Sequence, residues 1–382
     1  MTEACDLCGA TGLTPVYRAD DTARDLTVHL CPRCGLVQSL PRVHRVEQRR
    51  RALSSGAGWG NIRYGKGFRT GFALQLIGRL RPLDRLRRVL DVGANRGSFL
   101  FTLEAAVPQA ELWGVEPDDS ILGDYPAHPS IRLLPQRFED CQVPAGYFDL
   151  IYCSHTLEHV TEPSRVLAAI REAMCPDGLL LAEVPNLDFV AGDDLLEEFF
   201  IDKHLYHYSP ASFAQALAVV GFEPLETAVD RENVTILARF AEPKPCRPDQ
   251  EEAERARHWL ANYGERLRHN RLQLRTAAAR IAGFAPRRVA VWGGGRLFDS
   301  LVIHGGLDPH TLCGLYDRDL PRYVEQVHGI PVLAPDRLGE AAPEVLVIAS
   351  RAYFEEIRDH ARSLAHWPME IFSLFDLMNP GP

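Results

Sequence analysis

The sequence predicts an α/β protein with three parts: a small cysteine-rich segment, a doubly wound and mostly parallel sheet, and a second, smaller doubly wound domain. Three observations indicate this fold class. Two Cys-x-x-Cys-Gly turns lie near the N-terminus, strand-like and helix-like segments alternate from about residue 85 to 240, and the alternation resumes after residue 288. A chain of 382 residues is also longer than a domain with a single hydrophobic core usually is. We place the three domains at 1–45, 46–242 and 250–382.

The composition restricts the classes of partner. The chain has 46% hydrophobic and 24% charged residues and a formal charge of −9. We interpret the arginines at 49–51 and between 79 and 88 as solvated helix faces, so neither nucleic acid nor a membrane is expected as a partner. No apolar run reaches the roughly 20 residues of a membrane span, and the first eight residues contain no secretory h-region. We expect a cytoplasmic monomer or homodimer with a small-molecule substrate.

Four of the nine cysteines form two pairs, Cys5 with Cys8 and Cys31 with Cys34, each followed by glycine. Two residues between thiols let both sulfurs reach one ion from a single turn, and glycine accepts the positive φ that follows. Two such turns complete a tetrahedral shell, which predicts a closed, structural Zn²⁺ site. An iron site of the same geometry and unliganded thiols are the alternatives.

The middle of the chain predicts a parallel sheet with ligands at the carboxyl ends of its strands. Proline at 163 and Pro176-Asp177-Gly178 mark the start and end of one crossover helix. The expected strands are 88–92, 111–115, 131–134, 148–153, 179–184, 223–228 and 234–240, and the expected helices are 68–80, 98–106 and 163–174.

The segment after the first of these strands has the form Asp-x-Gly-x-x-x-Gly, with Asp91, Gly93 and Gly97. The third glycine of the dinucleotide fingerprint is absent, and a carboxylate at the strand end would repel a diphosphate. It suits a cationic ligand without phosphate, and S-adenosylmethionine is such a ligand. Glu116, at the end of the next strand, can accept both ribose hydroxyls, and Glu139 can meet the adenine amino group. The alternative is a scaffold whose glycines only pack helices.

Two further stretches resemble class I S-adenosylmethionine-dependent methyltransferases: Ser154-His155-Thr156-Leu157-Glu158-His159-Val160, and Cys175-Pro176-Asp177-Gly178 with Glu183-Val184-Pro185-Asn186. The resemblance implies a Rossmann-like methyltransferase sheet. Glu158 and His159 have the alternative of serving as helix-cap and packing residues, which we prefer for His159. The residues that the resemblance places around the cofactor are Gly93, Asn95, Gly97, Glu116, Phe138, Glu139, Ser154 and His155. Tyr64 is a further candidate, as part of a turn that closes over the methionine carboxylate; the alternative is a surface turn leading into the helix at 68–80.

The C-terminal segment begins with a long amphipathic helix over 251–281. Strand 288–292 then enters the turn Gly293-Gly294-Gly295, and strand 312–316 ends at Asp317. Phe298 occupies the place of the third fingerprint glycine, so we interpret this domain as substrate-holding or structural. An NAD site is the alternative.

The order of the three parts resembles the zinc-containing C-methyltransferases that act on nucleotide-linked keto-deoxysugars, over essentially the whole chain. The resemblance implies a sugar-nucleotide acceptor and methylation of carbon. C-methylation requires a base beside a carbonyl and a donor for the enolate. That family uses a Tyr-His-Glu-His sequence, where this chain has Ile201-Asp202-Lys203-His204. His204 is therefore the candidate base, with Tyr206 and His207 as proton partners; the alternative is an aromatic lid.

Other functions stay open at this stage. They are methylation of oxygen or nitrogen of another metabolite, a non-catalytic protein that binds S-adenosylmethionine, an oxidoreductase that uses the C-terminal glycine turn, and a nucleic-acid methyltransferase.

Overall fold

The computed structural model describes residues 4–19, 26–42, 68–118, 122–123, 125–201, 204–322 and 324–379. These residues form two compact units. The first contains the described residues up to 192 together with 199–263, and the second contains 193–198 and those from 264 onward.

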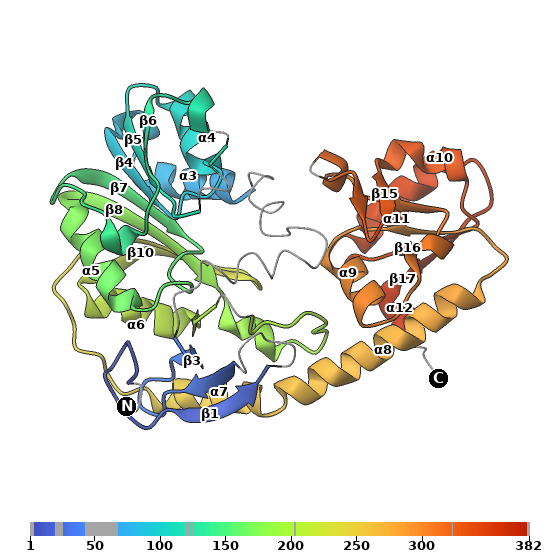
Figure 1. The fold of residues 1–382 in the computed structure, drawn as a ribbon, viewed down its shortest axis with the longest axis horizontal. Helices are drawn as coiled ribbons and strands as arrows, with labels where there is room; N and C mark the ends of the chain where they lie inside the picture. The colour runs from blue at the N-terminus through green and yellow to red at the C-terminus, as the bar shows by residue number, and fades with distance from the viewer. Residues whose placement is uncertain are drawn as a thin grey trace. The chain divides into compact units, whose positions relative to one another are not determined.

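The first unit is built around a seven-stranded sheet of order β10-β11-β8-β7-β4-β5-β6 (Figure 1). Neighbouring strands are parallel except at β10–β11 and β11–β8. The first five strands in chain order thus follow the doubly wound order 3-2-1-4-5, which switches direction between β4 and β7. The strands are β4 (Arg88–Val92), β5 (Glu111–Val115), β6 (Ile131–Leu134), β7 (Phe148–Ser154), β8 (Met174–Pro185), β10 (Phe222–Val229) and β11 (Asn233–Phe240).

Helices cover both faces of this sheet (Figure 1). Successive strand residues point to opposite faces, so Val89 packs with α3 and α4, whereas Leu90 packs with α5 and α6. The predicted strands and helices are therefore confirmed, because two-sided burial makes the strands almost continuously apolar. The helices are α3 (Phe68–Leu80), α4 (Ser98–Ala106), α5 (Pro163–Ala173) and α6 (Pro210–Val219).

The cysteine-rich segment belongs to the same compact unit. Its strands β1 (Thr14–Arg18), β2 (Thr27–Leu30) and β3 (Val37–Leu40) form an antiparallel sheet that β9 (Tyr206–His207) completes. Asp6 caps α5, because its carboxylate accepts the backbone amide and the hydroxyl of Ser164 at 3.0 Å each. The first Cys-x-x-Cys-Gly turn, or knuckle, is thereby fixed to a helix that covers the seven-stranded sheet.

One long helix was expected over 251–281, and the structure has two, α7 (Gln250–Ala261) and α8 (Tyr263–Gly283). The break lies at Asn262, with φ −112° and ψ 4°. It coincides with the burial of Tyr263, whose ring packs edge-on against Tyr17 and whose hydroxyl accepts the amide of Phe199 at 2.8 Å. A tertiary contact thus overrides a continuous helical pattern.

The second unit contains a six-stranded sheet of order β14-β15-β13-β12-β16-β17, parallel except for β14. Its parallel strands also follow the order 3-2-1-4-5. The strands are β12 (Val289–Trp292), β13 (Gly314–Tyr316), β14 (Gln326–Val327), β15 (Ile330–Leu333), β16 (Val345–Ile348) and β17 (Glu370–Ser373), and the helices after α8 are α9 (Arg296–Ile303), α10 (Leu338–Ala341), α11 (Phe354–Leu364) and α12 (Leu374–Met378).

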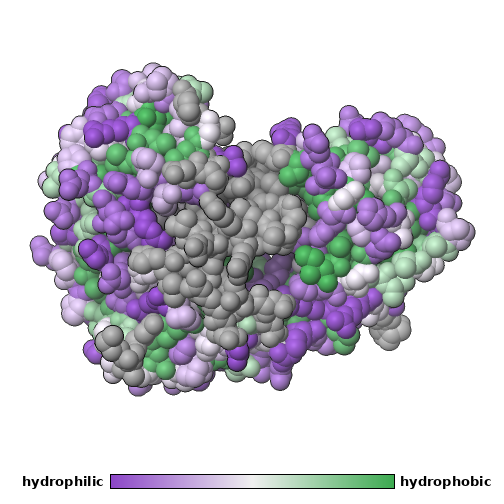
Figure 2. All heavy atoms as spheres, in the orientation of Figure 1, coloured by the Kyte–Doolittle hydropathy of each residue, from purple (hydrophilic) through white to green (hydrophobic). Residues whose placement is uncertain are grey.

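On the face shown in Figure 2, hydrophilic residues are spread over both units between smaller apolar areas. Among the described residues, no helix combines the length and the apolar character that a bilayer span requires.

Candidate functional site

The turn after β4 has the backbone that its glycines predict. Gly93, Asn95 and Gly97 have φ of +82°, +49° and +83°. A Cβ on Gly93 would overlap Oγ1 of Thr156, and a Cβ on Gly97 would overlap the ring of Phe101. Both glycines are thus required by the backbone conformation and by close contacts. The turn lies at the switch point between β4 and β7, where doubly wound sheets bind ligands.

Glu116 fixes this turn from the end of β5. Its side chain is only 2% exposed, and Oε2 accepts the backbone amide of Asn95 at 3.0 Å. Oε1 accepts the amide of Asp118, also at 3.0 Å. The carboxylate therefore lies beside the glycine turn, where the sequence places the ribose-binding acid.

Asp91 lies inside β4 and is fully enclosed. Burial, and then the charge of Glu116, raise the pKa of its carboxyl well above the ordinary value. A cation beside Asp91 would offset both effects and favour the ionised form. The pair of acids therefore fits a ligand with positive charge, as S-adenosylmethionine has.

Phe138 and Glu139 begin the short turn Phe138–Asp140, just beyond β6. Phe138 is buried in the core, while Glu139 is partly buried. Oε1 of Glu139 is enclosed and has no hydrogen-bond partner among the described residues. An amino group such as that of adenine would satisfy it.

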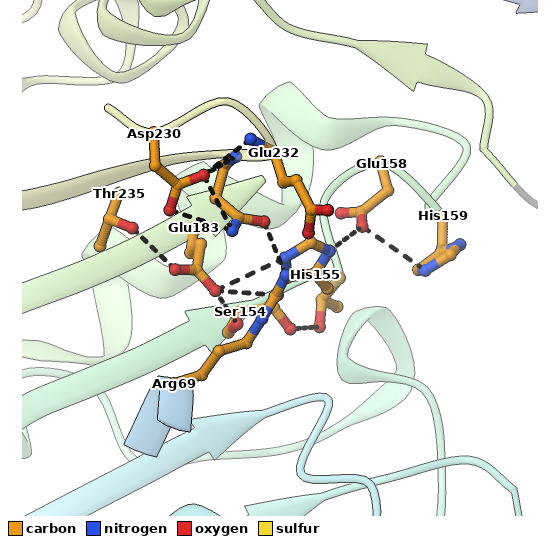
Figure 3. Close-up of polar contacts among 11 residues, drawn as sticks. Arg69, Ser154, His155, Glu158, His159, Glu183, Asp230, Glu232 and Thr235 are labelled. Atoms are coloured by element: carbon orange, nitrogen blue, oxygen red, sulfur yellow. Dashed lines mark hydrogen bonds and ion pairs between the residues drawn. The ribbon is translucent and has the colours of Figure 1, made fainter. Parts of the chain in front are cut away.

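Sequence reasoning missed the centre of a buried network at the ends of β7 and β8 (Figure 3). Glu183 in β8 lies opposite Ser154 in β7 and accepts the hydroxyl of Ser154 at 2.9 Å. Arg69 donates to the same oxygen at 3.0 Å, and Nε2 of His155 lies 3.5 Å from it. Thr235 donates to the other oxygen at 2.7 Å. Glu183 thus holds together two residues that the resemblance assigns to the cofactor.

A second missed residue, Tyr125, lies over the glycine turn. It is 5% exposed, and its hydroxyl donates to the carbonyl of Ala94 at 3.3 Å. Burial and the charges of Asp91 and Glu116 raise the pKa of this hydroxyl, so it stays a neutral donor. Nothing in its local sequence distinguishes it from an ordinary core tyrosine.

Glu158 and His159 are not helix-cap residues, because they lie in a turn before α5. The Glu158 side chain is 0% exposed, with Nδ1 of His155 at 3.1 Å and Nε2 of His159 at 3.7 Å from Oε1. The rings of His159 and His204 lie 4.9 Å apart. The candidate base His204 therefore belongs to a cluster of three imidazoles around one buried carboxylate.

The structure places Tyr206 and His207, the expected proton partners, in the interior. Both are 1–2% exposed and belong to β9. The hydroxyl of Tyr206 donates to the carbonyl of Thr161 at 2.7 Å, and Nε2 of His207 lies 2.8 Å from Oγ of Ser39. Burial lowers the pKa of His207 to about 3, so it stays neutral. Both side chains are interior residues; Tyr206 is bonded to the turn before α5, and His207 is bonded to β3. Tyr64, Asp202 and Lys203 lie outside the described residues.

The four N-terminal thiols converge. Sγ of Cys5 lies 3.6 Å from Sγ of Cys34, Sγ of Cys8 lies 3.5 Å from Sγ of Cys31, and all four lie within 4.8 Å of one another. The two turns also share a backbone pattern, since Gly9 donates to Cys5 and Gly35 to Cys31 at 2.9 and 3.0 Å. The glycines have φ of +69° and +75°, as the spacing predicts. This Cys₄ cluster can hold a metal ion.

The glycine turn of the second unit has a different role. Gly293, with φ +113°, approaches the chain after β16 so closely that a Cβ would overlap the carbonyl of Ala349. Phe298 is fully buried in the core of this unit. Asp317 accepts the amides of Gly294, Asp319 and Leu320 at 2.9–3.2 Å. The turn is thus closed by contacts of its own chain.

Comparison with known proteins agrees with this site. Residues 66–227 match the family described as "Methyltransferase domain". The matched residues include the glycine turn and its acids, so the central part of the chain is similar to methyltransferase domains.

Similar proteins match only part of this chain's length. A tRNA U34 carboxymethyltransferase of Desulforapulum autotrophicum is 31% identical over 127 residues, which are 32% of this chain and 38% of the relative. A trans-aconitate 2-methyltransferase of Deinococcus radiodurans is 33% identical over 109 residues, 28% of this chain and 41% of the relative. The chain thus spans about two fifths of the length of these relatives.

Solved structures match at low identity. A putative S-adenosylmethionine-dependent methyltransferase from Listeria monocytogenes is 14% identical, with a TM-score of 0.38, over 44% of this chain and 98% of that one. A 1,6-didemethyltoxoflavin-N1-methyltransferase from Burkholderia thailandensis is also 14% identical, with a TM-score of 0.35, over 60% of this chain and 100% of that one.

Proposed function

We propose that this protein methylates a small molecule, a nucleotide-linked keto sugar, at a carbon atom. The observation that carries the proposal is the meeting, at one end of the parallel strands, of a glycine turn with its acids and a buried cluster of imidazoles. The first set suits S-adenosylmethionine, and the second suits proton transfer beside a carbonyl.

On the cofactor side, each part of the ligand has a matching group. Glu116 suits the ribose hydroxyls, Glu139 the adenine amino group, and Asp91 with its neighbouring acid suits the positive charge. Ser154 and His155, held by Glu183, border the same turn. Bound S-adenosylmethionine supplies a methyl group whose bond to the sulfonium sulfur breaks on transfer, with a neutral thioether as the leaving group. The protein's own contribution is alignment and exclusion of water.

On the acceptor side, an imidazole of the Glu158 cluster accepts the proton that the acceptor carbon loses. A buried carboxylate orients an imidazole and stabilises its protonated form, as a catalytic base requires. The second unit is proposed to hold the nucleotide part of the acceptor or to serve as a structural domain. The Cys₄ cluster is proposed to hold a structural Zn²⁺, because four thiolates leave no open position.

The test is methyl transfer with a ¹³C-labelled methyl donor and a panel of nucleotide-linked keto sugars, followed by NMR of the product. The ¹³C shift of the new methyl group distinguishes carbon, oxygen and nitrogen as the acceptor atom. A methyl group on carbon is expected. A methyl group on oxygen or nitrogen would replace the acceptor atom in this proposal, and no transfer to any sugar would remove the substrate class.

A second candidate is suggested by the relative named tRNA U34 carboxymethyltransferase. The formal charge of −9 disfavours a tRNA substrate, because phosphate binding requires a basic surface. Bulk tRNA is therefore included as an acceptor in the same assay. Incorporation of label into tRNA, decreasing steeply with salt, would favour this candidate over a sugar.

A further inference from the structure

The cluster around Glu158 contains more imidazoles than one proton transfer requires. Nδ1 of His155 lies 3.1 Å and Nε2 of His159 3.7 Å from Oε1 of Glu158. Figure 3 shows both rings directed at this carboxylate from the turn that follows β7. The ligand atoms of Glu158, His159 and His204 all lie within 4.8 Å of one another.

Backbone hydrogen bonds hold these side chains together although they are distant in sequence. The carbonyl of Glu158 accepts the amide of Leu205 at 2.6 Å and that of Tyr206 at 3.4 Å. This places His204, the preceding residue, beside the Glu158–His159 turn. The amide of His159 in turn donates to the carbonyl of Thr156 at 2.9 Å. The cluster is therefore positioned by the fold before any ligand binds.

We propose that Glu158, His159 and His204 bind a divalent transition-metal ion with coordination positions left open. One carboxylate oxygen and two imidazole nitrogens are a set that zinc, cobalt and iron(II) favour, and three protein ligands leave room for water or substrate. Ligand atoms about 2.1 Å from one ion lie about 3 to 3.5 Å apart, so the cluster needs only a small contraction.

Burial supports an ion at this place. Glu158 is 0% exposed, and a carboxylate so enclosed is stable only beside compensating charge or donors. The His159 side chain keeps 22% of its surface exposed, so one side of the cluster can be reached. The combination of a buried acid and a reachable imidazole is that of an open metal site, in contrast to the closed Cys₄ cluster.

The ion would lie next to the cofactor turn. Thr156, two residues before Glu158, donates to the carbonyl of Val92 at 2.9 Å and lies against Gly93. An oxygen of the acceptor could then bind the ion beside the methyl donor. This step rests on the proposed function and assigns proton transfer to His155, with His204 as a ligand. It also favours an acceptor with a carbonyl or hydroxyl oxygen next to the methylated atom.

The experiment uses the full chain, with loosely held metal removed by a chelator and the Cys₄ metal retained. Co²⁺ is then titrated, and its visible absorption reports the ligands. A nitrogen and oxygen site gives d–d bands without the intense sulfur-to-metal charge transfer of a thiolate site. One equivalent with this spectrum is expected for the wild type. Glu158→Gln and His204→Gln should each weaken Co²⁺ binding at least tenfold.

His128→Ala is the matched control, because Nδ1 of His128 lies beside the Glu104 carboxylate without a further imidazole at that pair. It should bind Co²⁺ as the wild type does. Metal content of the Cys₄ cluster and affinity for S-adenosylmethionine, measured on every variant, show that the fold and the cofactor site are intact.

Two results would overturn the metal site: no sulfur-free Co²⁺ spectrum in the wild type, or unchanged Co²⁺ affinity in both cluster variants. In either case, retained binding of S-adenosylmethionine would leave the proposed methyl transfer standing, with the cluster acting as a hydrogen-bonded base. If the wild-type protein does not bind S-adenosylmethionine, the proposed function itself is contradicted.

Discussion

In the sheets of both units, the same backbone hydrogen bonds form just after the first two strands in chain order. In the first unit Gly93 donates to the carbonyl of Val115 at 2.9 Å, and Glu116 donates to that of Leu134 at 3.1 Å. In the second unit Gly293 donates to Tyr316 at 2.7 Å, and Asp317 donates to Leu333 at 3.0 Å. Each unit thus has a glycine turn after one strand and an acid after the next.

The units differ in the number of charged side chains that they bury near the ends of these strands. The first unit buries four carboxylates there, those of Asp91, Glu116, Glu158 and Glu183, each at most 4% exposed. Among the described residues of the second unit, no charged side chain is buried to this extent. Arg351, after β16, forms ion pairs with Asp194 and Glu197 that are partly exposed.

The difference shows that a glycine turn is not in itself a ligand site. Buried carboxylates lower stability unless they are compensated, and a cationic ligand beside Asp91 and Glu116 would supply part of that compensation. In the second unit the close approach of Gly293 to Ala349 and the hydrogen bond from Gly294 to Asp317 account for the conformation of the turn. Four predictions test this contrast, from the largest expected effect to the smallest.

Replacing one thiol should disrupt the N-terminal segment and leave the second unit unchanged. Loss of a structural Zn²⁺ removes on the order of 10 kcal/mol of binding free energy that supports folding. Cys34→Ser should therefore lose the metal, and hydrogen exchange should become fast in β1, β2 and β3 while β12 and β16 stay protected. Cys175→Ser, outside the cluster, is the control. Retention of one full equivalent of metal by Cys34→Ser would contradict a Cys₄ site.

The second prediction compares a buried with an exposed acid. Glu183→Gln leaves Arg69 with a neutral partner in a largely buried site, which should destabilise the first unit by about 3 to 5 kcal/mol. Glu226→Gln removes a pair with Arg79 at 3.4 Å whose arginine is 55% exposed, so less than about 1 kcal/mol is expected. Chemical denaturation measures both. Equal effects of the two substitutions would show that Glu183 does not hold the site together.

The third prediction concerns the acids after the second strand of each sheet. Glu116→Ala should weaken S-adenosylmethionine binding at least 100-fold, about 2.7 kcal/mol, because it removes the carboxylate beside the glycine turn. Asp317→Ala, its counterpart in the second unit, should leave that affinity unchanged. Calorimetric titration with S-adenosylmethionine, its demethylated product and NADH measures both. Saturable NADH binding that Asp317→Ala abolishes would show that the second turn is a ligand site after all.

Features of the fold and the site that depend on short sequence patterns could be predicted, whereas features that depend on contacts between distant residues could not. The strands, the glycine turn and the knuckles follow from short patterns, and the structure has them. The interior position of Tyr206 and His207 could not be predicted, because His207 pairs with Val37, far away in the sequence. The aromatic cluster around them suggested a lid, whereas pairing with β3 places it in the interior.

Glu183 carried a signal that could have been used. It is the single charged residue in the very apolar segment 179–184, and a charge inside a buried strand requires partners. Arg69 offered no such signal, because an arginine in an amphipathic helix resembles any solvated residue. The cluster of Glu158, His159 and His204 was missed for a related reason: the backbone hydrogen bonds of Leu205 and Tyr206 to Glu158 bring together residues that are distant in sequence.

The smallest effect is expected at Asp91, where stability and binding should change in opposite directions. The folded protein raises the pKa of this carboxyl by burial and by the charge of Glu116. The folded state therefore holds a proton that the unfolded state releases at about its ordinary value of 3.8, and stability falls as pH rises from there towards the folded pKa. Asp91→Asn does not titrate, so its stability should exceed that of the wild type increasingly with pH.

A gain of about 1 kcal/mol near neutral pH would raise the melting temperature of the first unit by about 2 to 4 °C. Thermal unfolding from pH 4 to 8 measures it. Asp317→Asn is the contrasting variant: its carboxylate is partly exposed and accepts three backbone amides, so the substitution should lower stability at every pH.

Asp91→Asn should also bind S-adenosylmethionine more weakly, because the cation loses a compensating charge. A variant that loses stability at neutral pH, or binds the cofactor unchanged, would show that the buried acids of the first unit are not compensated by the ligand.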